Sequence, residues 1–168
     1  MIPEIKNILY ATDLSKNSSY AFFYAADMAK RHNARIVILH SIESGRHHVV
    51  SVVETMIREA KKQEQEMNIE EIKNRLQEFY KKTDTQIGAP CVDLVSKILV
   101  PLGHPVEEIL KAADEESCDV IVLGTHGKGF LRQTFLGSVA GSVSERSRKP
   151  VFVIPLPSKE TNIDWDKI

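Results

Sequence analysis

The chain has 168 residues, of which 42% are hydrophobic and 27% are charged, and its formal net charge at pH 7 is −1. This length and balance are ordinary for one globular domain with a core of its own. The near-zero charge gives no electrostatic footprint for nucleic acid or an anionic membrane. The two cysteines, Cys91 and Cys118, stand in neither metal nor redox spacing, and the Asn-x-Ser sequon at Asn17 is read as accidental. No apolar run approaches the about 18 residues of a membrane span, and the start lacks a secretory segment, so we expect a cytoplasmic protein.

The first part of the chain reads as a buried strand, a helix and a second buried strand. Lys6–Ala11 (KNILYA) is a short apolar run of the kind that forms strands. Ser15 is placed to cap a helix over Lys16–Arg31, in which apolar residues recur at helical spacing. Arg35–Ser41 (RIVILHS) is rich in the β-branched residues that buried strands prefer.

The rest of the chain continues the alternation of strand and helix. Further helices are predicted at Glu54–Lys82, from Pro105 onward and at Ser138–Arg148, and further strands at Val92–Val100, Cys118–Leu123 and Val151–Ile154. The polar run KKQEQE inside the first of these helices indicates a break or an exposed stretch. In the segment 43–53 the pattern weakens, and Arg46–Val53 is either a loop or the start of this helix.

Strands that alternate with helices and are apolar throughout indicate an α/β fold with a parallel sheet covered by helices on both faces. No internal repeat, low-complexity stretch or long linker interrupts the pattern, so residues 1–157 are predicted to form a single domain, followed by a polar tail at 158–168. In such sheets, ligands bind beyond the carboxyl ends of the strands, where the strand order reverses. The alternation requires such a point but does not locate it.

The strongest functional pattern is the spacing Gly-x2-Gly-x9-Gly-Ser after a short apolar run, formed by Gly124, Gly127, Gly137 and Ser138. Glycine tolerates left-handed backbone angles and lets a ligand approach the backbone closely. Gly137 and Ser138 open a helix, where unpaired N–H groups and the positive end of the helix dipole favour an anion. The spacing therefore indicates a site for nucleotide phosphates, although glycines after a strand can also serve only as turns.

Two other phosphate motifs are excluded. A Walker loop needs Lys and a hydroxyl residue after the second glycine, but Gly129 is followed by Phe130. The dinucleotide pattern fails because Arg132 stands where its third glycine is required. Lys128 and Arg132 either neutralise the outer phosphates or are solvated surface charges.

Three polar residues carry open alternatives. Asp13 directly follows the first strand, where its carboxylate can bind ribose hydroxyls or Mg²⁺, or can only cap a turn. His126 invites a catalytic interpretation, but we favour a loop side chain that contacts ribose or phosphate. His40 lies in a predicted buried strand and is read as a satisfied core histidine.

Three segments together resemble the universal stress proteins, in their ATP-binding branch: YATDLS near the start, LHS at the end of the second strand and GTHGKG…LGSVA. The resemblance runs from Lys6 to Pro155, and its glycine spacing is its most specific part. It implies a three-layer sandwich of the adenine nucleotide alpha hydrolase-like kind, with a five-stranded parallel sheet in the order 3-2-1-4-5. The nucleotide would then lie between the ends of strands one and four.

The resemblance also implies a set of nucleotide-binding residues. They are Ala11, Thr12 and Asp13 around the adenosine, Ser41 at the adenine, Leu123, Gly124, Thr125, His126 and Gly127 around the ribose and α-phosphate, and Gly137, Ser138, Val139 and Ala140 at the outer phosphates. The chain departs from the family pattern at three of these positions. Ala11 replaces a frequent proline, Ser41 a common valine, and Ala140 a frequent hydroxyl residue.

The leading hypothesis is a dimeric regulatory module in stress response that binds ATP, ADP or AMP, with or without Mg²⁺ or Mn²⁺. No catalytic residue and no metal ligand are predicted. The resemblance implies a homodimer that forms through the last strand, Val151–Ile154, and acts on a client protein, with neither nucleic acid nor membrane as partner. Two alternatives remain open, a slow ATP hydrolase and an interaction scaffold without nucleotide.

Overall fold

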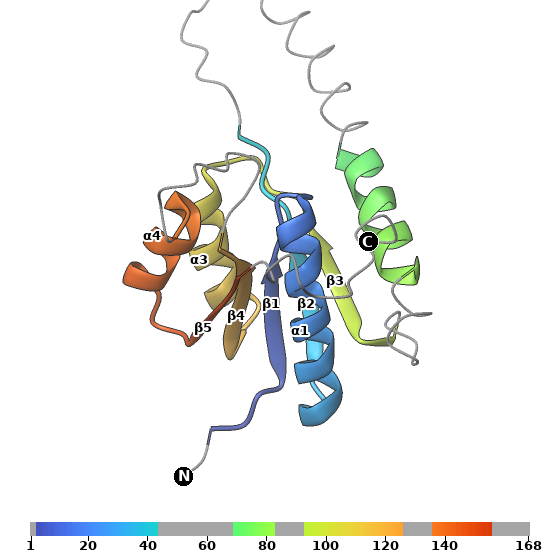
Figure 1. Cartoon of the computed structure of the whole chain (residues 1–168), viewed down its shortest axis with the longest axis horizontal. Helices are drawn as coiled ribbons and strands as arrows, with labels where there is room; N and C mark the ends of the chain where they lie inside the picture. Colours follow the sequence, from blue (N-terminus) through green and yellow to red (C-terminus); the bar gives the residue numbers. More distant parts are fainter. Residues whose placement is uncertain (1–2, 44–68, 83–92, 126–135, 156–168) are drawn as a thin grey trace, which may run out of the picture.

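The computed structural model describes residues 3–43, 69–82, 93–125 and 136–155 (Figure 1). The five strands among them are β1 (Asn7–Ala11), β2 (Arg35–Leu39), β3 (Val95–Leu99), β4 (Val120–Gly124) and β5 (Val151–Ile154). The helices are α1 (Lys16–His32), α3 (Pro105–Glu115), α4 (Ser138–Arg146) and a helix over residues 69–82.

The strands form one sheet in the order β3-β2-β1-β4-β5, and every pair is parallel. This confirms the predicted fold class and strand order. β1 lies at the centre, where Leu9 is opposite Val37 of β2 and Ile121 of β4. β2 and β3 lie on one side of β1, and the later strands β4 and β5 lie on the other side. The strand order therefore reverses between β1 and β4.

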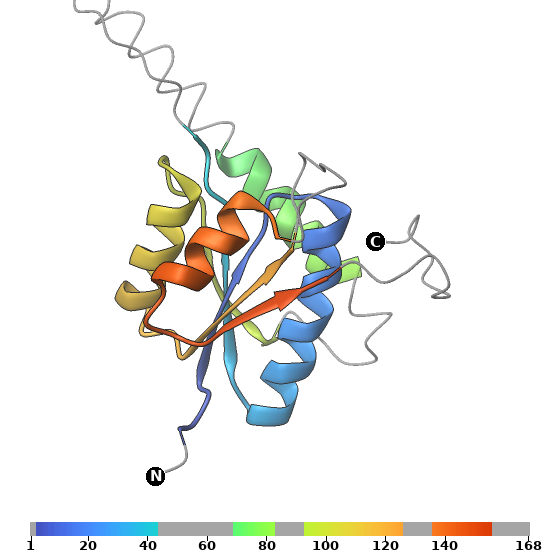
Figure 2. The same ribbon diagram turned by 60° about the vertical axis from the view of Figure 1, so that its left-hand side comes forward.

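The period of two along each strand divides the core between the two faces of the sheet. Ile8 and Tyr10 belong to a buried cluster that also contains apolar residues of α1 and of the helix over 69–82. Leu9 and Ala11 belong to a second cluster together with residues of α3 and α4. Both figures show this layering, with α3 and α4 on one side of the sheet and α1 on the other (Figures 1 and 2). The central strands β1, β2 and β4 lack a polar face because both of their faces are covered, whereas β3 at the edge of the sheet exposes Ser96 and Lys97.

Both ends of α1 are capped, and the N-cap is the residue predicted from the sequence. Ser15 is the N-cap, and its Oγ accepts the N–H of Ser18 at 3.2 Å. At the other end Asn33 adopts left-handed angles, with φ of 52°, and its N–H binds the last carbonyls of the helix. Asparagine tolerates this conformation better than most residues, so the turn after the helix is sharp.

Several strands are shorter than the apolar pattern predicted. The strand expected at Cys118–Leu123 is β4 and begins at Val120, because Cys118 is used to end α3. The N–H of Cys118 donates to Ala113 O at 2.9 Å, and Ser117, the residue before it, has a positive φ of 50°. The strand expected at Val92–Val100 is β3 and covers only Val95–Leu99. Of the helix expected at Glu54–Lys82, residues 69–82 are helical and the remainder lies outside the described residues.

Candidate functional site

The carboxyl ends of β1 and β4 lie next to each other at the point where the strand order reverses. This is the position at which parallel α/β sheets bind ligands. β1 leads into Thr12 and Asp13, and β4 ends in Gly124 and Thr125. The structure therefore brings together two of the three predicted segments of the site.

The loop from β1 to α1 is held by hydroxyl groups. Thr12 is 8% exposed, and its Oγ1 accepts the N–H of Leu14 at 3.0 Å and lies 2.9 Å from Ser18 Oγ. The Thr12 N–H donates to Leu39 O at 2.9 Å. Leu14 has a positive φ of 63°, a conformation that costs energy for a leucine and that the contacts around it must stabilise.

Asp13 is half-buried, and its Oδ1 accepts the N–H of Ser15 at 3.0 Å. This is the turn-capping contact that sequence reasoning held open as an alternative to ribose binding. A carboxylate has two oxygens with about four acceptor positions, so the same side chain can accept both the N–H of Ser15 and a ligand hydroxyl. The geometry is compatible with both roles.

Tyr10 lies beneath this loop and should make the protein sensitive to alkali. Its ring is 1% exposed, its hydroxyl donates to Ser18 O at 2.7 Å, and burial raises the pKa of Tyr10 well above its ordinary value of 10.0. A raised pKa in the folded state means that stability is complete below the ordinary pKa and falls as the pH rises above it. We expect the Tm to fall above about pH 10, and Tyr10→Phe to make this fall less steep. Thermal melts from pH 8 to 11 test this, and an unchanged slope in Tyr10→Phe would contradict it.

Because Gly124 has no side chain, the first turn of α1 can lie close to the end of β4. The φ of Gly124 is outside the left-handed region, so the backbone conformation does not itself require glycine. A Cβ at this position would lie 2.8 Å from Asn17 Nδ2, which shows how closely the first turn of α1 approaches. Asn17 is 4% exposed, and its Nδ2 donates to Thr125 Oγ1 at 3.5 Å. The N-terminus of α1 therefore lies against the end of β4.

A second helix N-terminus, that of α4, is attached to the same strand end. Gly137 is the N-cap of α4, and its N–H donates to Thr125 O at 2.7 Å. Thr125 is fixed in turn through its own N–H, which donates to Ile154 O at 3.0 Å. Ser138, the first residue of α4, is exposed, and the N–H groups of a helix's first turn have no carbonyl partner within the helix. The positive ends of two helix dipoles thus flank the end of β4, which favours an anion there.

The end of β2 forms the third part of the site. Ser41 is half-buried, and its Oγ donates to Gly103 O at 2.7 Å, which links it to the loop before α3. Ile42 and Leu102 form a parallel bridge next to this contact. His40, one residue earlier, has its Nδ1 2.8 Å from Thr12 O. The ends of β1, β2 and β3 are therefore joined by side-chain and backbone contacts.

The remaining predicted residues divide into two groups. Leu123 and Ala140 are 4% and 3% exposed and pack in the cluster on the α3 and α4 face, so they can face a ligand through their backbone atoms, and Val139 is partly buried against the same cluster. His126 and Gly127 lie outside the described residues, as do Lys128 and Arg132.

Two residues at the candidate site, Asn17 and His40, were not predicted from the sequence to belong to it. Asn17 was read only as part of an accidental glycosylation sequon, and the signal that could have found it is a polar residue on the buried face of an otherwise apolar helix. His40 was predicted to be a core histidine within a strand. It is half-buried, follows the last residue of β2, and makes a hydrogen bond to the β1–α1 loop.

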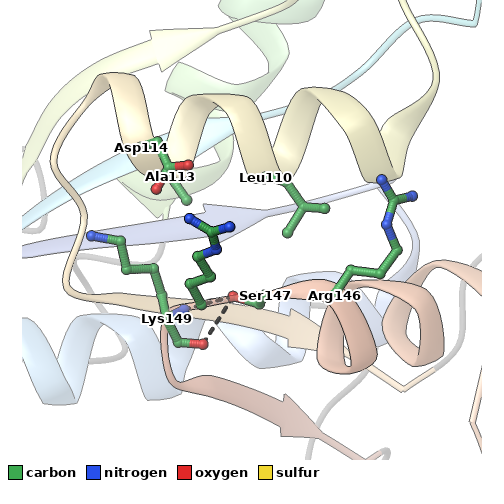
Figure 3. Close-up of a pocket in the computed structure, with 7 residues that line it drawn as sticks. Leu110, Ala113, Asp114, Arg146, Ser147 and Lys149 are labelled. Carbon is green, nitrogen blue, oxygen red and sulfur yellow. Dashed lines mark hydrogen bonds between the residues drawn. The ribbon is translucent and has the colours of Figure 1, made fainter.

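A recess of about 90 Å³ lies elsewhere, between α3 and the end of α4 (Figure 3). Arg146, Ser147 and Lys149 line it from one side, and Ser147 Oγ donates to Lys149 O at 2.9 Å. Arg146 is paired with Glu107 of α3 at 2.7 Å. The lining of the recess carries the basic side chains of Arg146, Arg148 and Lys149 and the acidic side chain of Asp114, close to the C-terminal ends of α3 and α4.

In the described part of the chain, no group of three or more His, Cys, Asp or Glu residues is arranged to hold a metal ion. None of the helices there is long and apolar enough to span a membrane.

Comparison with known proteins agrees with the fold. Residues 4–155 match the model of the universal stress protein family. Universal stress protein MJ0577 of Methanocaldococcus jannaschii is 32% identical over 154 residues, which cover 89% of this chain and 94% of the relative. The solved structure of MJ0577 superimposes with a TM-score of 0.71 at 29% identity, covering 92% of this chain and 99% of that one.

Two more distant structures share the fold. One is a universal stress protein from Archaeoglobus fulgidus in complex with dAMP, with a TM-score of 0.56, 24% identity and coverage of 92% and 99%. The other is a universal stress protein in complex with cAMP, with a TM-score of 0.60, 19% identity and coverage of 92% and 100%. The family match over nearly the whole chain and the relative above 30% identity lead to one conclusion: the chain belongs to the universal stress protein family.

Proposed function

We propose that this protein binds an adenine nucleotide at the carboxyl ends of β1 and β4 and acts as a dimeric regulatory module. The observation that carries the proposal is the hydrogen bond from Gly137 N to Thr125 O, 2.7 Å long. It joins the start of α4 to the end of β4, so that the N–H groups of a helix N-terminus lie beside the point where the strand order reverses. The phosphates bind at this N-terminus.

The adenosine half binds across the ends of β1 and β2. The Asp13 carboxylate accepts hydrogen bonds from ribose hydroxyls in addition to the N–H of Ser15. The hydroxyl of Ser41 already donates to Gly103 O, so Ser41 contacts the adenine through its backbone. His126 and Gly127, which follow β4 in the sequence and lie outside the described residues, are expected to contact the ribose and the α-phosphate.

Three observations support an adenine nucleotide as the ligand. The spacing Gly-x2-Gly-x9-Gly-Ser is complete in the sequence. Its two described ends meet, because Gly124 precedes Thr125 and Thr125 binds Gly137. Two universal stress proteins of the same fold have been solved with dAMP and with cAMP. Both of those ligands are adenine nucleotides.

A regulatory rather than a catalytic role fits the described side chains. Helix N-termini and hydroxyl groups bind phosphate, but hydrolysis also needs a group that orients an attacking water and a cation that stabilises the transition state. Among the described residues, the polar side chains around the ends of β1 and β4 include Asp13, Asn17, His40 and several hydroxyl residues, and Asn17 and His40 are engaged with Thr125 and Thr12. We therefore propose binding without fast turnover.

Ligand analysis and calorimetry test the proposal directly. Mass spectrometry of the small molecules released from freshly purified protein should show an adenine nucleotide, and titration of ligand-free protein with ATP should give saturable heat. If no nucleotide is released and titration with ATP gives no binding heat, the proposal is contradicted and a nucleotide-free scaffold is favoured. Turnover of many ATP molecules per minute that is lost in Asp13→Ala would instead identify an enzyme.

A further inference from the structure

His40 reaches from the end of β2 to the backbone of the β1–α1 loop. Its Nδ1 lies 2.8 Å from Thr12 O. A carbonyl oxygen can only accept, so Nδ1 carries the hydrogen and donates it. The backbone of His40 is itself fixed, because its N–H donates to Leu99 O of β3 at 3.0 Å. The imidazole is therefore anchored on the sheet while it holds a loop of the neighbouring strand.

The carbonyl that His40 holds belongs to the peptide unit between Thr12 and Asp13. A peptide unit is planar, so a hydrogen bond to its oxygen fixes the direction in which the next Cα lies. The Thr12 N–H and hydroxyl are already bound to Leu39 O and to the N–H of Leu14. His40 therefore supplies the contact that orients the peptide leading into Asp13.

The loop needs such a contact because its backbone is strained. Leu14 follows Asp13 directly and has a φ of 63°, in the left-handed region that a leucine rarely adopts. Strained residues persist only where the surrounding structure imposes the conformation. Contacts to Thr12 from both sides, from Leu14 N and from His40 Nδ1, have this effect on the loop.

We propose that His40 is a positioning residue for the nucleotide. Its Nδ1–H fixes the Thr12–Asp13 peptide, and this peptide in turn directs the Asp13 carboxylate toward the ribose hydroxyls. The inference rests on the proposed function of the site. His40 acts through the loop and does not itself contact the ligand, so its effect depends on the ribose hydroxyls being present.

The test compares His40→Leu with His40→Asn by calorimetric titration of ATP and of 2′,3′-dideoxy-ATP. Asparagine carries an N–H at the same distance from the backbone as Nδ1, so it retains the donor, whereas leucine removes it. We expect His40→Leu to bind ATP about tenfold more weakly than the original protein, and His40→Asn to bind it nearly as well. With 2′,3′-dideoxy-ATP, which lacks both ribose hydroxyls, the original protein and His40→Leu should have similar affinities.

The outcomes separate this inference from the proposed function. An equal loss for both ligands in His40→Leu, an unchanged ATP affinity, or no recovery in His40→Asn would overturn the role of His40. Absence of ATP binding by the original protein would overturn the proposed function instead. His32→Leu is the matched control, because His32 is exposed at the far end of α1 and should leave both affinities unchanged. If His40→Leu does not fold, His40→Gln, whose N–H lies one bond farther out, replaces it with the same expectation.

Discussion

Replacing Gly124 by alanine should lower the stability of the fold and the affinity for ATP together. The new Cβ would lie 2.8 Å from Asn17 Nδ2 and 3.3 Å from the Asn17 carbonyl carbon. Asn17 is 4% exposed in the first turn of α1, so its side chain has little room to move aside. We expect the free energy of unfolding to fall by about 1–3 kcal/mol, the usual cost of overpacking a core. Urea denaturation measures this loss, and titration with ATP measures the affinity.

The cause of the loss can be isolated with two further variants. Gly141→Ala places its Cβ 3.7 Å from Leu136 Cδ2, an ordinary contact, in the interior of α4. It should raise the free energy of unfolding by about 0.5–1 kcal/mol, because alanine has a higher helix propensity than glycine. In an Asn17→Ala background the 2.8 Å contact with the side chain is removed and only the 3.3 Å approach to the backbone carbonyl carbon remains, so Gly124→Ala should cost less there. An equal cost in both backgrounds would contradict the contact.

The fold could be predicted from the sequence because its signals are local. Each buried strand is a short apolar run, and the helices between them carry their own caps, as Ser15 and Asn33 show for α1. The order of the strands could not be predicted from such local signals, because alternation of strand and helix requires a reversal of the strand order but does not locate it. The family resemblance located it, and the sheet order β3-β2-β1-β4-β5 confirms that position.

Strand ends were predicted less well, for a physical reason. Cys118 is an apolar residue two positions before the run Val120–Leu123, so composition assigns it to the strand. Its N–H nevertheless completes the end of α3 by donating to Ala113 O. Such a choice between two hydrogen-bond partners depends on the positive φ of Ser117, which composition does not reveal.

The candidate site shows the same limit at the level of single side chains. The sequence identified Gly124 and explained it by backbone freedom and ligand approach. In the structure its φ is not left-handed, and the space beside it is taken by Asn17 from α1. His40 likewise looks like a core histidine until the fold brings it to Thr12 O. Both contacts join residues from different elements, and a single sequence without tertiary geometry does not contain them.

The last strand is the place where the proposed dimer should form. In the described part of the chain β5 pairs with β4 on one side, and its other edge is open. Phe152 is 46% exposed at this edge, and Ile154, two residues on, points into the α1-side cluster. Side chains two apart share a face, so Phe152 also points to the α1 side. An exposed apolar edge strand favours pairing with another chain, and a second copy of β5 is the partner we propose.

Phe152→Lys should therefore convert the dimer into a monomer without unfolding the protein. A lysine on an edge strand opposes strand pairing, and the exposed position tolerates the charge. Sedimentation equilibrium should show a dimer dissociation constant raised at least about tenfold, an effect typical of an aromatic anchor at an interface.

Leu102→Lys is the matched control, because Leu102 is 42% exposed beyond the end of β3 on the opposite edge, and this variant should remain dimeric. Val153→Asp is a less clean test, since Val153 is partly buried against the α3 and α4 cluster and its charge would also lower the Tm. A Phe152→Lys protein that stays dimeric would contradict the β5 interface.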